Sequence, residues 1–496
     1  MEIQLKLPKD IKGEMVMRGL GIFIILISTT LVFFSQSNAT DSETNALEKD
    51  KVQKEKIGPE YSNNQEVSAP LEAVELRLIG KDSLPIDLAT AIRIASSDNL
   101  EIAEARARVL EAKGESSAAF GGLIPVVSLF FGYGRTDGRV QGSFGELRDV
   151  TFDTLSPGII ASYILNPGES IYSAIAAHRN VDAVKSDESA ITQDVLLAVV
   201  EGYYDLVEAQ GNVNVSEKTV SDANNLVKIA EVLEKQGIGP GADVVRAKTD
   251  LANKEQRLIT AQEEFREASA DLALILKVDS SVTLFPSDTQ IRQIKFVDNL
   301  NMLDDLINDT LKKHPEIMSA SKQVDAAGAE VSGVWLGALG PEVLLEAEIG
   351  GIGDRFGNIG EREIYQGVIG VSLSASSYGE IKASRARLRR AEIRKEEERE
   401  RLRADVVKTH DEVLSSEEKI IPAREELESA EESLKLSQVR FKRGLGLAVE
   451  VIQAEDALAS ARLNYIRSII NYNKAQVRLL NAIGEITVEK LVAGLQ

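Results

Sequence analysis

The chain carries the same sequence pattern twice, and this duplication limits the folds that it can adopt. Each copy has a polar residue that opens a helical run and, further on, a pair of glycines followed by an acid. These are Asn99-Leu100-Glu101-Ile102 and Gly237-Ile238-Gly239 with Asp243 in the first copy, and His314-Pro315-Glu316-Ile317 and Gly444-Leu445-Gly446 with Glu450 in the second. The offsets are nearly equal, at 215 residues (99 to 314) and 207 residues (237 to 444). Such a repeat predicts one object built from two similar halves.

The duplication also predicts how the chain is divided. Residues 1–39 have the pattern of a signal peptide, and residues 40–80 form a polar, aperiodic stretch that we interpret as a flexible N-terminal extension. The first structural repeat is expected at 81–287 and the second at 288–496. In each repeat we expect a short helix, a pair of alternating strands, a very long helix, a glycine tip and a long returning helix.

Composition excludes several classes of function. The net charge is −21, and an acidic chain repels nucleic acid, so no nucleic-acid partner is expected. There is no cysteine, which excludes disulfides, thiolate metal sites, a cysteine nucleophile and a lipid-modified N-terminal cysteine. Aromatic residues are only 5% of the chain, and long helices with alanine, leucine and valine seams need few of them.

The N-terminus predicts export from the cytoplasm. Residues 19–34 are nearly all apolar and follow basic residues that end at Arg18, and Ser37-Asn38-Ala39 then offers small residues at the two positions that a signal peptidase reads. This pattern favours a mature chain that starts at Thr40. The alternative is an N-terminal membrane anchor, because the apolar run approaches the length of a membrane span.

Four short segments alternate between apolar and other residues with the period of a β-strand. They lie at 125–134, 158–166, 343–349 and 369–376. The polar sides of the last two carry Glu346, Glu348, Ser372 and Ser374. One wet face suits a soluble sandwich as well as a barrel with lipid outside and water inside, so the strands alone leave both open. In a barrel these four residues would face the lumen.

The helical segments favour the barrel. Segments 169–236 and 379–443 keep helical spacing over about 100 Å each, at about 1.5 Å per residue, far beyond an ordinary helix. The segments 242–277 and 448–483 are expected to return antiparallel beside them after the glycine tips. A helix is also expected from residue 88 to about 120. Pro422 is expected to kink its helix or to end it for a turn.

The order and duplication of these motifs resemble the TolC family of outer membrane efflux channels over about residues 80 to 487. The residues that carry the resemblance are the two helix openings, the two glycine tips with their acids, Leu88, and Ala475 to Gly484. The resemblance implies a mixed α and transmembrane β fold: a homotrimer in which each protomer gives four strands to a twelve-stranded barrel. The long α-helical hairpins would form a trimeric periplasmic tunnel.

The resemblance also implies location and partners. The protein would lie in the outer membrane with a periplasmic extension, as in a Gram-negative type of envelope. It would be the passive exit duct of a tripartite export system, fed by an inner-membrane transporter through a periplasmic adaptor (membrane fusion) protein. The alternative from another class is an envelope-associated coiled-coil scaffold without a pore, and the amphipathic strand pairs speak against it.

The tips hold the candidate gate residues. Members of the family often carry acids just after the second tip; Glu450 matches one such position, whereas Gln453 stands where an aspartate is common. Asp243 is the counterpart of Glu450 in the first copy. The resemblance implies a ring of carboxylates that gates the tunnel and selects cations. The structural alternative is a solvated helix start, where an acid is favoured by the helix dipole.

The four tip glycines, Gly237, Gly239, Gly444 and Gly446, are expected to make turns with positive φ. By resemblance they also form the tip that docks the adaptor. The sequence offers no nucleophile with a base and no metal constellation, so we expect no enzyme, no cofactor and no metal. The histidines at 178, 314 and 410 lie in separate segments and are interpreted as helix or helix-entry residues.

Overall fold

The computed structural model describes residues 83–287, 291–297, 302–371 and 374–495. All of these residues belong to one compact unit. The predicted signal peptide at 1–39 and the predicted extension at 40–80 lie outside the described residues.

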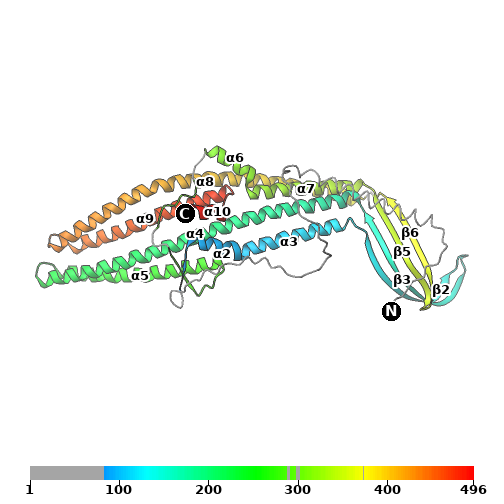
Figure 1. The fold of residues 1–496 in the computed structure, drawn as a ribbon, viewed down its shortest axis with the longest axis horizontal. Helices are drawn as coiled ribbons and strands as arrows, with labels where there is room; N and C mark the ends of the chain where they lie inside the picture. Colours follow the sequence, from blue (N-terminus) through cyan, green and yellow to red (C-terminus); the bar gives the residue numbers. More distant parts are fainter. Residues whose placement is uncertain (1–82, 288–290, 298–301, 372–373, 496) are drawn as a thin grey trace, which may run out of the picture. The chain divides into compact units, whose positions relative to one another are not determined.

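The elements follow the predicted order twice (Figure 1). The first copy consists of β1 (Ser83–Ile86), α2 (Leu88–Asp98), α3 (Leu100–Gly121), β2 (Val126–Gln141), β3 (Leu147–Leu165), α4 (Pro167–Lys235), α5 (Gly241–Leu276) and β4 (Thr283–Pro286). The second consists of α6 (Leu303–Lys313), α7 (Pro315–Leu339), β5 (Glu342–Arg355), β6 (Asn358–Gly370), α8 (Ala375–Lys442), α9 (Ala448–Ala482) and α10 (Val488–Leu495). The duplicated architecture is therefore confirmed.

The helix predicted from residue 88 to 120 is divided at Asn99. This buried side chain caps α3, because its Oδ1 accepts a hydrogen bond from the backbone N–H of Glu101 at 2.8 Å. Its Nδ2 donates to the carbonyl oxygen of Ile275, in the last turn of α5, at 3.1 Å. One side chain therefore joins the start of α3 to the end of α5.

His314 forms the matching joint between α6 and α7. Its Nδ1 accepts from the backbone N–H of Glu316 at 3.3 Å, so Nε2 carries the proton and donates to the carbonyl oxygen of Asn481 at 3.2 Å. Pro315 at the first position of α7 reinforces the break, because the residue before a proline is disfavoured in helical conformation. His314 is thus a helix-entry residue, as the sequence predicted.

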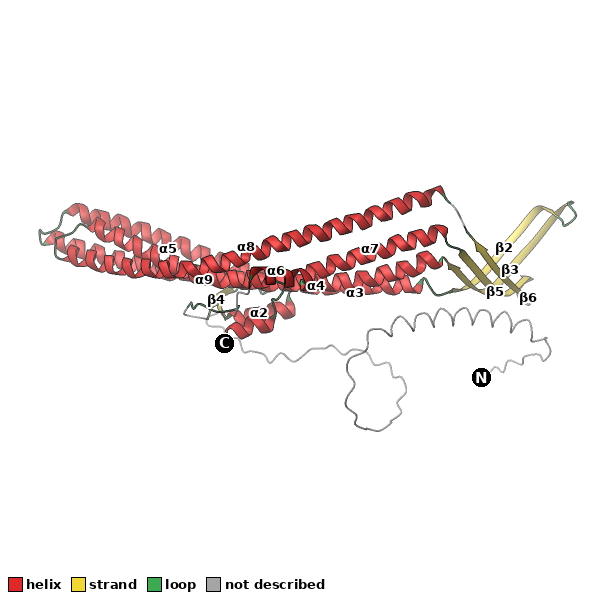
Figure 2. Ribbon diagram, turned by 90° about the horizontal axis from the view of Figure 1, so that it is seen from above, coloured by secondary structure: helices red, strands yellow, loops and turns green. Residues whose placement is uncertain are grey.

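The two long helices have 69 and 68 residues, which is about 100 Å each. α4 packs against α5 and α7, and α8 packs against α9 (Figure 2). α8 continues through Pro422, so the helix is not ended there. The lost hydrogen bond is tolerated because the neighbouring Ile420 is buried against Tyr472 and other residues of α9.

The apolar core has two main parts. One cluster joins the last turns of α5 and α9 to α2, α4, β4 and α10. The second lies at the tip end, where α4, α5, α8 and α9 pack together. Among the described helices, none combines the length and the apolar composition that a membrane crossing requires.

Four strands form an antiparallel sheet in the order β2-β3-β5-β6, and β1 pairs in parallel with β4 in a separate two-stranded sheet. The pairings connect Leu129 to Ile159, and Ile159 to Ile349, so the apolar sets that the sequence analysis identified lie on one face of the sheet. The strands are longer than predicted, because β2 and β3 extend beyond residue 134 and before residue 158.

The fourth strand is present, but it lies at Asn358–Gly370 and not at the predicted 369–376. β6 ends at Gly370, whose partner is Glu342, the first residue of β5, so β5 has no residue left to pair with the chain beyond Gly370. Ser374 is instead the N-cap of α8, and its Oγ accepts from the backbone N–H of Ser376 at 3.2 Å. Ser372 lies outside the described residues.

The joint at Asn99 predicts a measurable loss of stability. Asn99→Ala removes the cap of α3 and leaves the Ile275 carbonyl without its donor, so we expect a loss of about 1–3 kcal/mol. Thermal unfolding followed by helical circular dichroism in detergent measures it. Asn225→Ala, at an exposed position of α4, is the matched control and should be neutral. Equal melting of the two variants would contradict the role given to Asn99.

Candidate functional site

The two helical tips are built in the same way. The backbone N–H of Ile238 donates to the carbonyl oxygen of Leu233, and that of Leu445 donates to Arg440, each at 3.0 Å. The glycine before each donor, Gly237 or Gly444, has a positive φ of 70° or 71°. This is the Schellman ending of a helix, in which a left-handed residue lets the chain reverse after the last turn.

The other two tip glycines serve a different purpose. Gly239 and Gly446 do not have positive φ, so the prediction of a left-handed turn is wrong for them. They allow close packing instead: a Cβ on Gly239 would lie 3.1 Å from Cβ of Leu233, and one on Gly446 would lie 3.3 Å from Cβ of Arg440. The returning chain therefore passes against the helix that it has just left.

The two tips touch one another. A Cβ on Gly444 would lie 2.7 Å from Cγ2 of Ile238, so the side chain of the first tip covers the turn of the second. Ile238 and Leu445 stand at equivalent positions in the two turns, and both are exposed. The tips thus form one joint surface with two apolar side chains at its end.

The candidate gate acids differ in their environment. The side chain of Asp243 is only 4% exposed and its Oδ1 lies 3.0 Å from Nη1 of Arg246, one turn further along α5. That of Glu450 is 41% exposed and its Oε2 lies 3.8 Å from Nε of Arg440, across the turn. Gln453 is exposed on the next turn of α9. Each acid has a basic partner within its own chain, which the sequence did not identify.

A buried ion pair lies behind the tips, and sequence reasoning missed it. Nζ of Lys254 on α5 lies 2.6 Å from Oε2 of Glu455 on α9, and 2.9 Å from Oδ2 of Asp250. The side chains of Lys254 and Glu455 are 2% and 3% exposed. A signal was present: Lys254 falls midway between Ala247 and Ala261, on the seven-residue repeat of a buried seam.

The pKa values of this pair reflect burial and mutual attraction. Burial lowers the pKa of Lys254, but the carboxylates of Glu455 and Asp250 outweigh that effect and the pKa lies above its usual 10.5. Burial raises the pKa of Glu455 above 4.5, against the attraction of Lys254. The raised pKa of Lys254 contributes stability that is fully present below pH 10.5 and is lost as the pH rises through the folded-state value.

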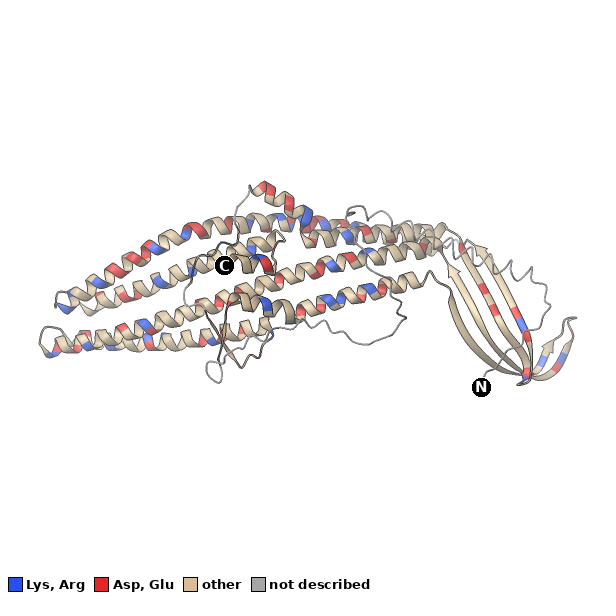
Figure 3. Cartoon of the chain, in the orientation of Figure 1, with Lys and Arg blue, Asp and Glu red and all other residues tan. Residues whose placement is uncertain are grey.

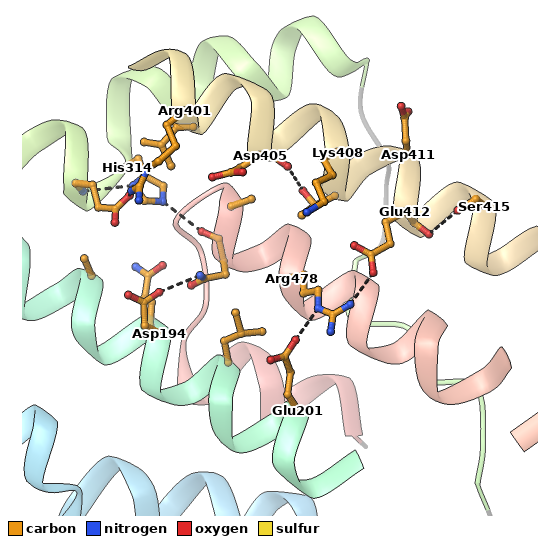
Figure 4. A pocket seen from close by; sticks show the side chains of 18 residues that line it. Asp194, Glu201, His314, Arg401, Asp405, Lys408, Asp411, Glu412, Ser415 and Arg478 are labelled. Carbon is orange, nitrogen blue, oxygen red and sulfur yellow. Dashed lines mark hydrogen bonds and ion pairs between the residues drawn. The ribbon is translucent and has the colours of Figure 1, made fainter. Parts of the chain in front are cut away.

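A second cluster of charged side chains lines a cavity of about 730 Å³ between α4, α7, α8 and α9 (Figure 4). Arg478 on α9 bridges two helices, with Nε 2.5 Å from Oε1 of Glu201 and Nη1 2.6 Å from Oε1 of Glu412. Nη2 of Arg401 lies 2.6 Å from Oε2 of Glu316. Burial lowers the pKa of His314 at the edge of this cavity, which favours the neutral imidazole of the joint. These contacts hold four helices together.

The sheet provides the second part of the site. Glu346 pairs with Ser162 on one side and with Gln366 on the other, so these residues share a face. Glu348 lies on the same face, 3.9 Å from Nε of Arg362. The opposite face carries exposed apolar side chains, among them Val127, Leu129, Phe131, Tyr133, Ile159, Ile349, Tyr365 and Ile369. The sheet is therefore apolar on one open face and partly charged on the other.

Comparison with known proteins gives the family. The sequence profile of the outer membrane efflux proteins matches residues 91–276 and 306–485. The chain belongs to the outer membrane efflux protein family. The resemblance stated from the sequence is thus confirmed, together with the outer membrane location and the role in efflux.

The similarity extends over most of the chain. The pyoverdine export outer membrane protein OpmQ of Pseudomonas putida is 22% identical over 80% of this chain and 86% of its own. The CmeC outer membrane channel of Campylobacter jejuni has a TM-score of 0.71 at 14% identity, over 82% of this chain and 88% of that one. The MtrE outer membrane channel of Neisseria gonorrhoeae has a TM-score of 0.69 at 15% identity, over 80% and 88%. CmeC and MtrE are outer membrane channels, and OpmQ is an export protein of the outer membrane.

Among the described residues, no group of three or more histidine, aspartate or glutamate side chains is arranged to hold a metal ion.

Charged residues are spread along the long helices, and on β2 and β3 they gather toward the hairpin between them (Figure 3).

The buried ion pair predicts a strong non-additive effect. Lys254→Met leaves Glu455 and Asp250 buried without a cation, so we expect a loss of about 3–5 kcal/mol. Lys254→Met with Glu455→Leu removes the two most buried charges and leaves only Asp250, whose side chain is 12% exposed, so it should recover part of that loss. Thermal unfolding of the single and double variants in detergent measures the coupling. Lys248→Met, whose partner Glu231 is exposed, serves as control and should be nearly silent; additive losses in the double variant would refute the pairing.

Proposed function

We propose that the chain is the passive exit duct of a tripartite export system. Three copies form one channel, in which the sheets make an outer membrane barrel and the helical hairpins make a periplasmic tunnel. The inner-membrane transporter supplies the energy, and the chain itself performs no catalysis and holds no cofactor. The observation that carries this proposal is the four-stranded sheet with one apolar open face and two free edges.

The dimensions of the sheet support a membrane barrel. Along β3 the apolar face runs from Leu155 to Leu165. At about 3.3 Å per residue and a tilt of about 40°, this is about 25 Å of height, the apolar band of an outer membrane barrel. β2 and β6 have no partner on their outer sides within the described chain, so they can pair with neighbouring copies. Glu346 and Glu348 would then line an acidic lumen.

The tips support docking of a periplasmic adaptor. Gly237 and Gly444 expose the turns, and the apolar side chains of Ile238 and Leu445 project from them into solvent. Exposed apolar side chains beside a fixed backbone are typical of a surface that binds a partner. Gly239 and Gly446 keep the turns narrow by packing the chain against its own helix.

The tip acids fit a gate of the proposed tunnel. In a three-fold assembly Glu450 and Asp243 would each occur three times around one axis. A ring of carboxylates in a narrow opening attracts cations and repels anions. Arg440 beside Glu450 supplies the basic partner that a closed ring of like charges needs. Gln453 contributes no charge to this ring.

The duct proposal predicts pore activity of the purified protein. We expect a trimer that stays soluble only in detergent and gives discrete conductance steps in planar lipid bilayers, because its apolar sheet face requires lipid. The trimer mass and the conductance are measured on the same preparation. A monodisperse protein that remains soluble without detergent and is silent in bilayers would instead support a scaffold without a pore.

The gate proposal predicts a change in ion selectivity. Glu450→Gln with Asp243→Asn should lower the cation preference and shift the opening threshold, because two rings of negative charge are removed. Gln453→Glu adds a ring and should raise the cation preference. Reversal potentials in salt gradients across planar bilayers measure both effects. Glu428→Gln, an exposed acid away from the tip on α8, is the control, and equal selectivity of all four proteins would leave the acids as ordinary helix-start residues.

A further inference from the structure

The two outer strands of the described sheet, β2 and β6, both change from apolar to charged residues along the apolar face. On β2 the residues of this face are apolar up to Tyr133, and the next ones are Arg135, Asp137 and Arg139. On β6 the same face begins with Ile369 and Tyr365 and then carries Glu363 and Glu361. Each edge thus changes from apolar to charged, and the first charged residue is a cation on β2 and an acid on β6.

In the proposed function, on which this inference rests, three copies form one barrel. The geometry of such a barrel limits how the edges of neighbouring copies can meet. Each copy spans four strand spacings of about 4.8 Å around the barrel. Because the strands are tilted by about 35–45°, the next copy is displaced along the strand direction by about 13–19 Å, or about four to six residues. Only an even displacement keeps the apolar face of every copy outward, because a one-residue slip turns each side chain to the other face. Displacements of four and six residues therefore remain.

The lengths of the strands decide the direction of the displacement. If β6 (Asn358–Gly370) is displaced toward the β2–β3 hairpin of its neighbour, all of its 13 residues find partners in β2 (Val126–Gln141). In the opposite direction most of β6 would need partners before the first residue of β2. At most about five residues of β6 can then pair. Unpaired backbone groups are costly in lipid, so the first direction is favoured.

Both allowed registers bring Arg135 against an acid. With a displacement of four residues, Gly370 pairs with Val126 and Glu361 stands opposite Arg135. With six, Glu363 stands opposite Arg135, but Glu361 then stands opposite Asp137, and this pair of like charges favours the displacement of four. Directly opposite side chains on one face have Cβ atoms about 4.5–5.5 Å apart, within reach of an ion pair.

We propose that Arg135 of one copy forms an ion pair with Glu361 or Glu363 of the next copy, and that this contact sets the register of the seam between copies. Arg135 is available for it, because it is 60% exposed and its Nη1 lies 3.9 Å from Oδ1 of Asp153 on its own β3. In the assembly the guanidinium lies between Asp153 and the neighbour's acid, and it compensates charges on the rim of the lipid-facing surface.

Cysteine pairs test the seam, and the chain has no cysteine of its own. Arg135→Cys is combined with Glu361→Cys in one protein and with Glu363→Cys in another. Isolated outer membranes that contain each protein are treated with an oxidant, so that neighbouring cysteines form a disulfide. One of the two proteins is expected to give covalent dimers and trimers on denaturing gels. Arg148→Cys with Glu361→Cys is the control, because Arg148 lies on β3, one strand away from the seam, and it should give none.

Charge reversal provides a second test on the same trimers. Arg135→Glu should lower the temperature at which the trimer dissociates, and Glu361→Lys or Glu363→Lys in the same chain should restore it. Arg148→Glu should not be rescued by either acid change. Conducting trimers in which neither cysteine pair cross-links and neither reversal is rescued would overturn the seam alone. A monomer in detergent would overturn the seam together with the proposed duct.

Discussion

The fold depends on covering two helices of about 100 Å along their whole length. Neither return helix is long enough: α5 has 36 residues and α9 has 35, beside 69 in α4 and 68 in α8. The remaining half of α4 is covered by α3 and α7, and that of α8 by α7. Each long helix is therefore flanked by shorter helices that meet near its middle.

The joints at Asn99 and His314 lie where these shorter helices meet. Each side chain caps the helix that starts there and reaches the last turn of the return helix from the same copy, at Ile275 or Asn481. Helix ends carry unpaired carbonyl and N–H groups, which are costly when they are buried. A single polar side chain satisfies one group of each kind, so the long helix keeps nearly continuous cover. Asparagine and histidine can both do this, because each offers an acceptor and a donor.

The two copies are alike in backbone and unlike in charge. By the offset of 207 residues, Lys254 corresponds to Ala461 and Glu455 corresponds to Lys248. The buried pair therefore joins positions that the duplication does not make equivalent. Burying two charges gains little net stability, but a mispaired charge at such a site is costly. The pair thus favours one register of the first hairpin against the second, which apolar seams of alanine and leucine specify weakly.

Local features of the sequence predicted most of the fold. The glycine tips, the helical spacing and the alternation of the strands are properties of neighbouring residues, and the structure has them where they were expected, with Schellman turns at Gly237 and Gly444. The wrong φ at Gly239 and Gly446 is a local error, and the other errors concern contacts between distant residues. The fourth strand was placed at 369–376 because Ser374 fits an alternating pattern, whereas β6 ends where its partner β5 begins. The bonds of Lys254 and Arg478 join helices that are distant in sequence, so the local repeat that marks Lys254 as buried could not identify its partner.

The two tip acids hold equivalent positions in the sequence repeat, but their contacts in the structure differ. Asp243 is buried and forms a short ion pair with Arg246 on its own helix. The guanidinium of Arg246 therefore compensates most of the electric field of this carboxylate at the protein surface. Glu450 is far more exposed, and its longer contact with Arg440 spans the turn between two helices. Arg246 is 54% exposed, so its pair with Asp243 is shielded on the carboxylate side only, whereas both members of the Glu450–Arg440 pair are exposed and this pair is weakened by salt. A field at the opening of the proposed tunnel would therefore come mainly from Glu450, and it would vary with the distance between α8 and α9 at the tip.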